Sequence, residues 1–444
     1  MLFVVDGGDL LARPRLRNEV DRRQAEVKSA LFAKALQEGG IDAMAIGKGD
    51  VAIGWDRFKS FASEHTLPYV ATNVSCADGA PFPTQAIVTK GQVKLGILAV
   101  VPEDIDVGDC TVSAPTAALK TVAAALPPDT DVTLAIGMFR EDEAKALAEQ
   151  VPEIDFVLTS KGLSFDNGRP LSRDQWLIGA GSRGKRLGVL TATTTPGHKG
   201  WENAKKGNDL QDRMKRYEGR LKKANEKLAD ASDDRATQRA QRQVDFYTKE
   251  LETLRGELGA LDIQRTIEPN TFKTRLQELS GGVRDSDPIE KLLKATLQEL
   301  SRTEQAANLE SKAEKPNFPA FAGHPVCAQC HPAETAQWAQ TAHASAYATL
   351  VDEERELDAD CYQCHVTGAF HPDGPKTPSH GAVLASVQCE ACHGPAADHA
   401  KEPLQHKPVK TPPLATCTEC HDAKQDMGRF ERDTYWPKVV HSQP

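Results

Sequence analysis

A chain of 444 residues has room for about three domains, and its formal net charge of −9 lacks the basic excess of a nucleic-acid-binding protein. No apolar run approaches the ~18 residues that a transmembrane helix needs. We therefore expect a multidomain protein with no nucleic-acid partner and no transmembrane segment.

Short apolar runs alternate with helical patterns in residues 1–199. Enrichment in Val and Ile indicates strands, and apolar residues three and four apart indicate helices at 25–37 and 141–150. The predicted strands are 2–5, 43–46, 69–71, 85–89, 93–100, 132–136, 156–158 and 186–191. This alternation predicts a layered α/β domain.

Several segments of this region resemble the N-terminal domain of 5′-nucleotidases, which has the calcineurin-like metallophosphoesterase fold. The matching segments are Val5-Asp6-Gly7-Gly8-Asp9, residues 40–47, 68–74 and 93–98, and a closing strand at 184–188. The resemblance implies an α/β sandwich over about residues 1–195.

The residues that bind two metals in that family are largely replaced. Gly8-Asp9 matches the Gly-Asp ligand motif, but Gly47-Lys48-Gly49-Asp50 replaces Gly-Asn-His-Glu, and Ser160-Lys161-Gly162-Leu163 replaces Gly-His-x-His. The lone histidine ligand falls near Met138-Phe139, and the Asp-x-His strand would precede residue 1. Because two-metal hydrolysis requires both ions, the resemblance implies an inactive domain used for binding or positioning. Lys48 and Lys161 would suit an anion there.

Residues 200–315 are rich in charge and poor in Gly and Pro. Two apolar seams with heptad spacing predict an antiparallel coiled-coil hairpin turning at 230–234, with a third helix near 289–300. The seams are Leu210, Met214, Tyr217, Leu221, Ala224 and Leu228, then Val244, Tyr247, Leu251, Leu254, Leu258 and Leu261. This arm is either a solvated spacer or a docking arm through which the chain forms a homo-oligomer.

Four C-x-x-C-H motifs follow within residues 316–444. In such a motif, two thiols bond covalently to one porphyrin and the histidine binds its iron. The motifs predict four covalently bound haem c groups, with His331, His365, His393 and His421 as proximal ligands. The attachment residues are Cys327, Cys330, Cys361, Cys364, Cys389, Cys392, Cys417 and Cys420.

Zinc and disulfides are the competing interpretations of these cysteines. Paired C-x-x-C motifs do bind zinc, and an exported chain could use disulfides. Neither explains a histidine in the same place four times. Cys76 and Cys110 remain, either as buried thiols or as a pair.

Histidine is the favoured sixth ligand, because residues 316–444 contain one methionine, Met427, and seven further histidines. A helix predicted over 332–350 would place His343 about 18 Å from His331, so His343 serves another haem. His399 follows His393 by a turn and also serves a different haem. The seven are His324, His343, His371, His380, His399, His406 and His441.

The four motifs and their surroundings resemble the tetrahaem cytochrome c family of the hydroxylamine-oxidation pathway. The match includes residues 323–331, Trp338–Ala344, 360–368 and 387–395. It implies closely packed haem pairs, His399 as distal ligand of the haem on His331, and His343 and His441 as distal ligands of others. It also implies a five-coordinate haem on His365. His371 and His380 are additional and could close that open site, and His324 is a further candidate distal ligand.

We therefore expect an electron carrier between redox proteins, with an inactive phosphoesterase-like domain. The alternatives are a multihaem reductase of a small nitrogen or oxygen species and a phosphoesterase fused to a cytochrome. Covalent haem attachment implies a periplasmic or extracellular protein. Because Met1–Asp6 lacks the features of a signal peptide, we expect the natural chain to begin further upstream.

Overall fold

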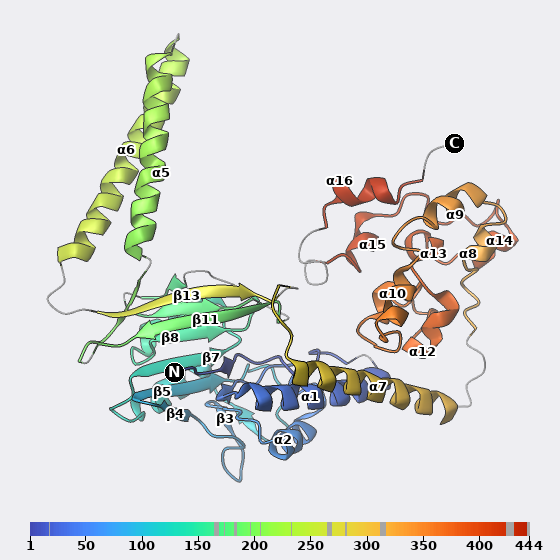
Figure 1. Ribbon diagram of the computed structural model, residues 1–444, viewed down its shortest axis with the longest axis horizontal. Helices are drawn as coiled ribbons and strands as arrows, with labels where there is room; N and C mark the ends of the chain where they lie inside the picture. Colours follow the sequence, from blue (N-terminus) through green and yellow to red (C-terminus); the bar gives the residue numbers. More distant parts are fainter. Residues whose placement is uncertain are drawn as a thin grey trace. The chain divides into compact units, whose positions relative to one another are not determined.

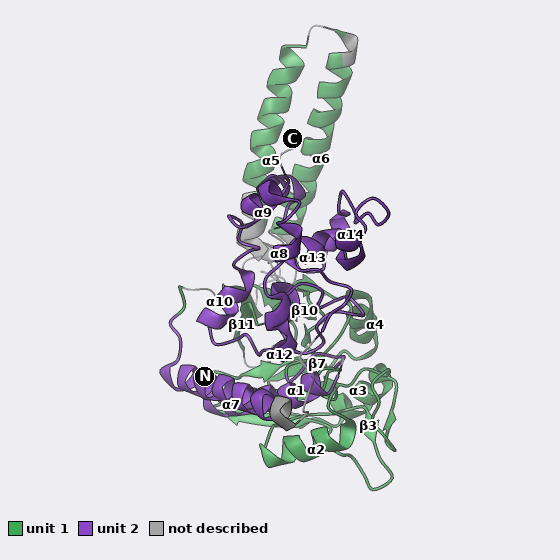
Figure 2. Cartoon of the chain, turned by 90° about the vertical axis from the view of Figure 1, so that its right-hand side faces the viewer, with its two compact units in different colours: residues 1–10, 40–283 green, residues 11–39, 284–444 purple. Residues whose placement is uncertain are grey.

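The computed structural model describes residues 1–16, 18–163, 168–172, 174–181, 184–195, 197–204, 206–231, 233–263, 269–279, 282–310, 317–422 and 430–441. The chain forms two compact units, and each contains segments from distant parts of the sequence (Figure 2). Unit 1 consists of residues 1–10 and 40–283, and unit 2 of residues 11–39 and 284–444. The boundaries expected after residues 199 and 315 do not coincide with these units.

Unit 1 is an α/β fold whose largest sheet has six strands in the order β4-β5-β7-β8-β10-β9 (Figure 1). The central strands β5, β7, β8 and β10 are parallel, and β4 and β9 pair antiparallel at the edges. Buried parallel strands are typically continuous apolar runs, which is why the sequence predicts most of them. The bounds are β4 Ala86–Lys90, β5 Val93–Val100, β7 Val132–Gly137, β8 Phe156–Thr159, β9 Arg169–Pro170 and β10 Trp176–Gly179.

A second sheet of three strands, β11-β13-β12, completes the core of unit 1. The bounds are β11 Arg186–Thr193, β12 Trp201–Asn203 and β13 Asn270–Glu278. The Phe272 ring of β13 contacts Phe156 edge-on at 5.2 Å and Trp176 at 4.8 Å between ring centroids. Since all three side chains are buried, β13 belongs to the same core as the six-stranded sheet.

The remaining elements of unit 1 are short strands and surface helices. The parallel pair β1 (Val5–Asp6) and β2 (Ala43–Met44) precedes α2 (Trp55–Glu64), and β3 (Val74–Ser75) pairs with β6 (Thr111–Val112). Helices α3 (Pro115–Ala124) and α4 (Glu141–Gln150) pack their apolar side chains, including Leu119 and Leu147, into a second buried cluster. The strand at 93–100 and the helix at 141–150 are confirmed residue for residue.

One strand prediction was wrong, and several strands of the structure were not predicted. Residues 69–71 form only an isolated bridge, between Tyr69 and Met44. The strand β10 was missed, and β12 and β13 lie in the region expected to be helical. In β13, buried Phe272 and Thr274 alternate with exposed Lys273 and Arg275. The composition of this segment is as charged as that of the helices before it, so composition does not identify it as a strand. Packing against the core of unit 1 decides its conformation.

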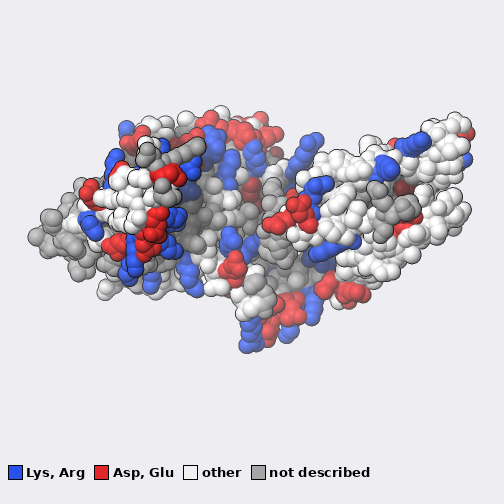
Figure 3. Space-filling view, turned by 90° about the horizontal axis from the view of Figure 1, so that it is seen from above, with Lys and Arg blue, Asp and Glu red and all other residues white. Residues whose placement is uncertain are grey.

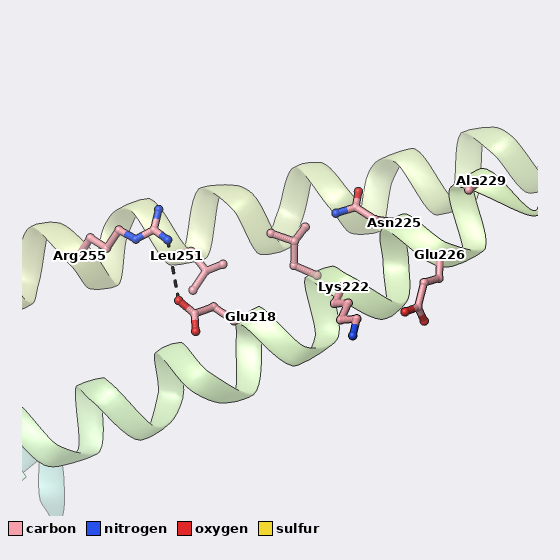
Figure 4. Close-up of a pocket in the computed structure, with 8 residues that line it drawn as sticks. Glu218, Lys222, Asn225, Glu226, Ala229, Leu251 and Arg255 are labelled. Atoms are coloured by element: carbon pink, nitrogen blue, oxygen red, sulfur yellow. Dashed lines mark ion pairs between the residues drawn. The ribbon is translucent and has the colours of Figure 1, made fainter.

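The helical arm of unit 1 consists of α5 (Lys206–Ala229) and α6 (Asp234–Ile263), which lie side by side as a hairpin (Figure 1). Every predicted seam residue whose burial is described is buried or half-buried, whereas the other faces are charged and exposed. Tyr217 contacts Tyr247 at 5.8 Å, and Glu218 pairs with Arg255 at 3.8 Å beside a shallow open groove (Figure 4). The seam therefore holds the two helices to each other.

Unit 2 is helical, with two long helices and many short ones joined by loops. The long ones are α1 (Glu19–Gly39) and α7 (Asp287–Glu310), so the helix expected near 289–300 is confirmed and longer. The short ones are α8 His324–Cys327, α9 Pro332–Trp338, α10 Ala346–Asp352, α11 Tyr362–His365, α12 Pro378–Gly381, α13 Cys389–His393, α14 Ala397–Lys401, α15 Leu414–Thr418 and α16 Arg432–Tyr435. No helix within the described ranges combines the length and apolarity of a bilayer span.

The single helix expected over 332–350 was wrong, because the chain leaves the helix at residue 339 and resumes it at 346. The hydroxyl of Thr341 donates to the carbonyl of Trp338 at 2.7 Å, and the carbonyl of His343 accepts from the Val387 amide at 3.1 Å. The carbonyls of Trp338 and His343 thus accept hydrogen bonds from outside the pattern of an α-helix, which is consistent with the break in the helix.

Helix α1 joins unit 2 through buried polar contacts, although it lies between two strands of unit 1 in the sequence. The amide of Gln24 donates to the carbonyl of Leu357 and accepts from the amide of Ala359, both at 2.8 Å. The Lys28 ammonium lies 2.5 Å from both Asp358 and Asp360. Val20 packs in the same apolar cluster as Phe321, Tyr362 and Leu384. Unit 2 therefore requires residues 11–39 as part of its own core.

The Asp358 carboxylate is the most strongly held charge in this contact. Burial alone would raise its pKa, but attraction and hydrogen bonds from Lys28 and Arg355 lower that pKa from 3.8 to about 2. The depressed pKa means that the charged form stabilises the folded state. That stabilisation is complete above pH 4 and is lost as the pH falls through about 2.

We predict that Asp358→Asn lowers the free energy of unfolding of unit 2 by about 2 kcal/mol at pH 6. The difference from the unsubstituted protein should disappear near pH 2, where the native carboxylate is protonated. Urea unfolding of the full chain between pH 2 and 7, followed by far-UV circular dichroism, measures it. The exposed Asp352→Asn is the matched control, and an equal loss in both variants contradicts the prediction.

Candidate multihaem site

Each C-x-x-C-H segment forms a tight helical turn. The amide of His331 donates to the carbonyl of Cys327 at 2.9 Å, and the amide of His421 donates to that of Cys417 at 2.8 Å. The second and third motifs lie in α11 and α13. One turn of helix brings residues four apart to the same face, so each motif places its first cysteine and its histidine on one side.

The four motifs lie close together in pairs. The thiol of Cys327 lies beside that of Cys389, and the thiol of Cys420 lies beside that of Cys364, close enough for each to shift the pKa of its neighbour. The eight motif cysteines are free thiols in this structure. The first motif is therefore next to the third, and the second is next to the fourth.

A buried carboxylate inside the third motif locks two motifs together. The Glu390 side chain is 3% exposed and accepts backbone N–H bonds from Ala322, Gly323 and Ala396, all at 2.8 Å. Gln388 similarly accepts from the amide of His324 at 2.8 Å. Neither residue can be identified from the sequence, because nothing in the spacing distinguishes a buried Glu within C-x-x-C from an exposed one.

Three pairs of histidine rings face each other at similar distances. The ring centroids are 6.3 Å apart for His331 and His399, 6.1 Å for His343 and His421, and 6.1 Å for His393 and His441. Two metal–nitrogen bonds of about 2 Å, with about 1 Å from each nitrogen to its ring centre, span about 6 Å. Each pair therefore has the separation of two imidazoles that share one iron.

Hydrogen bonds at Nδ1 orient several of these rings. The Nδ1 atoms of His393, His399 and His365 lie 2.6, 2.7 and 2.5 Å from the carbonyls of Val409, His406 and Ala346. Since a carbonyl only accepts, Nδ1 carries the proton and Nε2 is left free as a metal ligand. Gln337 orients His441 in the same way, at 2.5 Å. Burial, and then the neighbouring His421, lowers the pKa of His343, which favours the neutral ligand form.

His365 differs from the other three motif histidines. Within the described residues, its ring contacts the carbonyl of Ala346 and the hydroxyl of Thr349, and no histidine ring is paired with it. His371 packs on Phe321 at 5.5 Å and His380 on Phe318 at 6.3 Å. His324 packs on Trp338 at 4.8 Å. Met427 lies outside the described residues.

These residues fit covalently bound porphyrins. Each thiol pair stands beside an imidazole, three opposing imidazoles are in place, and Nε2 atoms are free for iron. Among the described residues, the apolar cluster in this part is small and centres on Phe321, Tyr362, Val366 and Leu384. A small apolar core is consistent with porphyrins that supply the missing apolar surface.

Two segments of unit 1 that resemble metal-ligand motifs, residues 8–9 and 47–50, lie together. Their polar groups form hydrogen bonds with one another. Asp50 accepts from the amides of Asp9 and Gly47 at 2.8 Å, and Asp9 accepts from the amide of Gly49 at 2.6 Å. A Cβ on Gly47 would lie 2.4 Å from the nitrogen of Asp9, so only glycine fits there. Lys48 pairs with Asp104. Within the described ranges, no three His, Cys, Asp or Glu side chains gather as metal ligands.

The two cysteines outside the motifs form a disulfide. Cys76 and Cys110 are bonded across a Cα–Cα distance of 4.2 Å, beside the β3–β6 pair. The sequence analysis left this pair open. A structural disulfide is typical of a protein that folds in an oxidising compartment.

Comparison with known proteins identifies the haem-bearing segment as cytochrome-like. Residues 326–394 match the family model described as cytochrome c554 and c-prime. The cytochrome c-554 of Nitrosomonas europaea is 33% identical over 113 residues, which is 21% of this chain and 48% of that protein. The chain thus spans about half of this curated relative, and the C-terminal part is a c-type cytochrome domain by resemblance.

Solved structures similar to the N-terminal part of the chain include a phosphoesterase and a thiohydrolase. The calcineurin-like phosphoesterase YfkN of Bacillus subtilis is 13% identical with a TM-score of 0.42, over 67% of this chain and 83% of that one. The sulfate thiohydrolase SoxB of Thermus thermophilus is 15% identical with a TM-score of 0.38, over 44% and 36%. Scores this low carry no argument about the activity of unit 1.

We predict that His399→Ala converts one haem, that on His331, from low spin to high spin. Removing the opposed imidazole leaves that iron with one axial protein ligand. Electron paramagnetic resonance of the oxidised protein measures the change, and added imidazole should reverse it. His406→Ala is the matched control, because His406 contributes only its backbone carbonyl to His399. A high-spin signal of equal size in both variants contradicts the assignment.

Proposed function

We propose that this protein is an exported tetrahaem c-type cytochrome that carries electrons between redox proteins. One observation carries the proposal: three opposed imidazole pairs, each about 6 Å apart, coincide with three of the four attachment motifs. Bis-histidine ligation closes both faces of an iron, so that iron exchanges electrons and binds no substrate. When bound, the haem supplies the redox chemistry, and the chain positions it.

In this proposal each haem has a defined set of protein groups. Cys327 and Cys330 hold the first haem between His331 and His399. Cys361 and Cys364 hold the second, on His365. Cys389 and Cys392 hold the third between His393 and His441, and Cys417 and Cys420 hold the fourth between His421 and His343. His324, His371 and His380, each packed on an aromatic ring, are left without a ligand role.

The single unpaired motif histidine favours a second candidate function, a reductase of a small nitrogen or oxygen species at the haem on His365. An iron with one open face binds such molecules, whereas the other three do not. Nitric oxide or nitrite added to the protein distinguishes the two functions. Turnover at that haem supports the reductase, and binding without turnover supports the carrier.

Unit 1 has a non-catalytic role in this proposal. Lys48 stands at the Asn position and Lys161 at a His position of the motifs that resemble metal-ligand sequences, and Lys48 is already paired with Asp104. We propose that unit 1 binds or positions partners. The α5–α6 hairpin acts with it as a coiled-coil arm and is the candidate surface for homo-oligomer formation.

The proposed location is the periplasm or the cell exterior. Covalent haem attachment and the Cys76–Cys110 disulfide both suit an oxidising compartment.

We predict four haems per chain when the protein is produced in a host competent for cytochrome maturation. A pyridine haemochrome assay against protein concentration measures the number, and metal analysis should find four irons and no zinc. The Cys417→Ser/Cys420→Ser variant should retain three haems. Colourless or zinc-loaded protein would exclude the proposed function.

We predict no hydrolysis of a chromogenic phosphate ester by the full chain in the presence of Mn²⁺. The residues needed to hold two ions on the reacting oxygens are replaced. Release of nitrophenol is followed at neutral and alkaline pH, with a calcineurin-like phosphoesterase as the positive control. Turnover that disappears in Asp9→Asn would contradict the inactive assignment.

A further inference from the structure

The loop between α14 and α15, residues 402–413, lies at the surface and contacts two proposed haem ligands. Ten of its twelve residues are exposed and the other two are half-buried. The Leu404 side chain is 89% exposed and Val409 is 50% exposed. Two apolar side chains of the loop are therefore available at its surface, and its charges, described below, indicate what kind of partner they suit.

This loop also forms hydrogen bonds to two proposed ligands of different haems. The carbonyl of His406 accepts from Nδ1 of His399, and the carbonyl of Val409 accepts from Nδ1 of His393, at 2.7 and 2.6 Å. The amide of Val409 additionally donates to the carbonyl of His393 at 3.0 Å. A partner seated on the loop is therefore one hydrogen bond away from an imidazole of the first haem and of the third.

The loop is locally basic in an acidic chain. It contains Lys407, Lys410 and Glu402, which gives a net charge of +1, whereas the whole chain has −9. Glu402 lies 3.6 Å from the His406 ring. Within the described part of the chain, neither lysine of the loop has an ion-pair partner. In Figure 3, residues without charge (white) cover much of the haem-bearing part at the right, with basic (blue) and acidic (red) residues among them.

The loop is also conformationally restricted. Four of its twelve residues are proline: Pro403, Pro408, Pro412 and Pro413. Each proline fixes one backbone dihedral, so little entropy is lost when a partner binds. A preorganised apolar patch flanked by like charges suits a small, transient encounter between redox proteins.

We infer that the 402–413 loop is the electron-exchange surface and that its partner is a redox protein with an acidic patch. Leu404 and Val409 provide the apolar contact, and Lys407 and Lys410 steer the negative patch onto it. The haem-loaded protein would give one electron to the partner, which would be reduced by one electron, and no bond would break or form and no proton would move. This inference rests on the proposed function.

The test uses the haem-loaded full chain and the charge-reversal variant Lys407→Glu/Lys410→Glu. Stopped-flow spectroscopy follows oxidation of the reduced protein by an acidic blue-copper protein at low ionic strength. We expect the second-order rate constant to fall about tenfold, since electrostatic steering commonly changes such rates by that order. The rate of the native protein should fall with added salt, and the rate of the variant should rise. With a basic monohaem cytochrome c as acceptor, the variant should be the faster one.

The matched control is Lys120→Glu/Lys145→Glu, which changes the net charge equally at two exposed lysines of α3 and α4. An equal fall in both variants would mean that only total charge matters and would overturn the inference. A variant that keeps native rates but loses binding to phosphatidylserine vesicles would assign the loop to a membrane surface and overturn it too. If the native protein transfers no electron to either acceptor, the proposed function fails. If it does and Lys407→Glu/Lys410→Glu matches it, only the docking surface fails.

Discussion

Opposed imidazole rings about 6 Å apart are the constraint on which the haem-bearing part of this protein depends. Each pair joins residues that are 48 to 78 positions apart in the sequence, so the pairs serve as long-range crosslinks once iron is bound. Most helices here have four to seven residues and would not be stable alone. The imidazole pairs, the Glu390 carboxylate and the porphyrins together replace the large apolar core that such short helices cannot form.

The same constraint explains why irregular backbone is tolerated in this part. Carbonyls at Ala346, His406 and Val409 lie outside regular ladders and accept from ligand imidazoles instead. A loop that appears unstructured by its sequence thereby holds two ligands in place. Because the carbonyls that orient His399 and His393 lie in an exposed loop, the proposed electron exchange would use the same 402–413 segment that holds these rings.

Helix α1 belongs to unit 2, although the segments before and after it in the sequence belong to unit 1. In the sequence it is the first helix of an α/β fold, between β1 and β2, yet its polar side chains are satisfied by residues 357–360, directly before the second attachment motif. The segment that carries Cys361 and His365 is therefore completed by residues from the other end of the chain. The helix that this segment needs is thus inserted between two stretches of unit 1 in the sequence.

The sequence by itself predicted a haem c cofactor and its attachment residues, and it located most of the buried parallel strands, β10 being the one it missed. These depend on local chemistry: a thiol pair with a histidine, or a continuous Val- and Ile-rich run. It also predicted the helical hairpin, because heptad spacing is a local pattern. Family resemblance suggested the His331–His399 pair, and the structure places these two rings opposite each other.

Only the tertiary structure decided the partners of His343 and His441, the break in the helix expected over 332–350, the strand β13 and the membership of α1. Each depends on contacts between residues far apart in the sequence. Lys273 and Arg275 are equally compatible with a helix or a strand. The packing of Phe272 on Phe156 and Trp176 selects the strand. In the sequence, Gln24 and Lys28 look like ordinary surface residues of a helix. Only the structure shows that they contact Ala359 and Asp358. A local sequence pattern carries no information about contacts with distant residues. The tertiary structure therefore decides which of the possible local conformations forms.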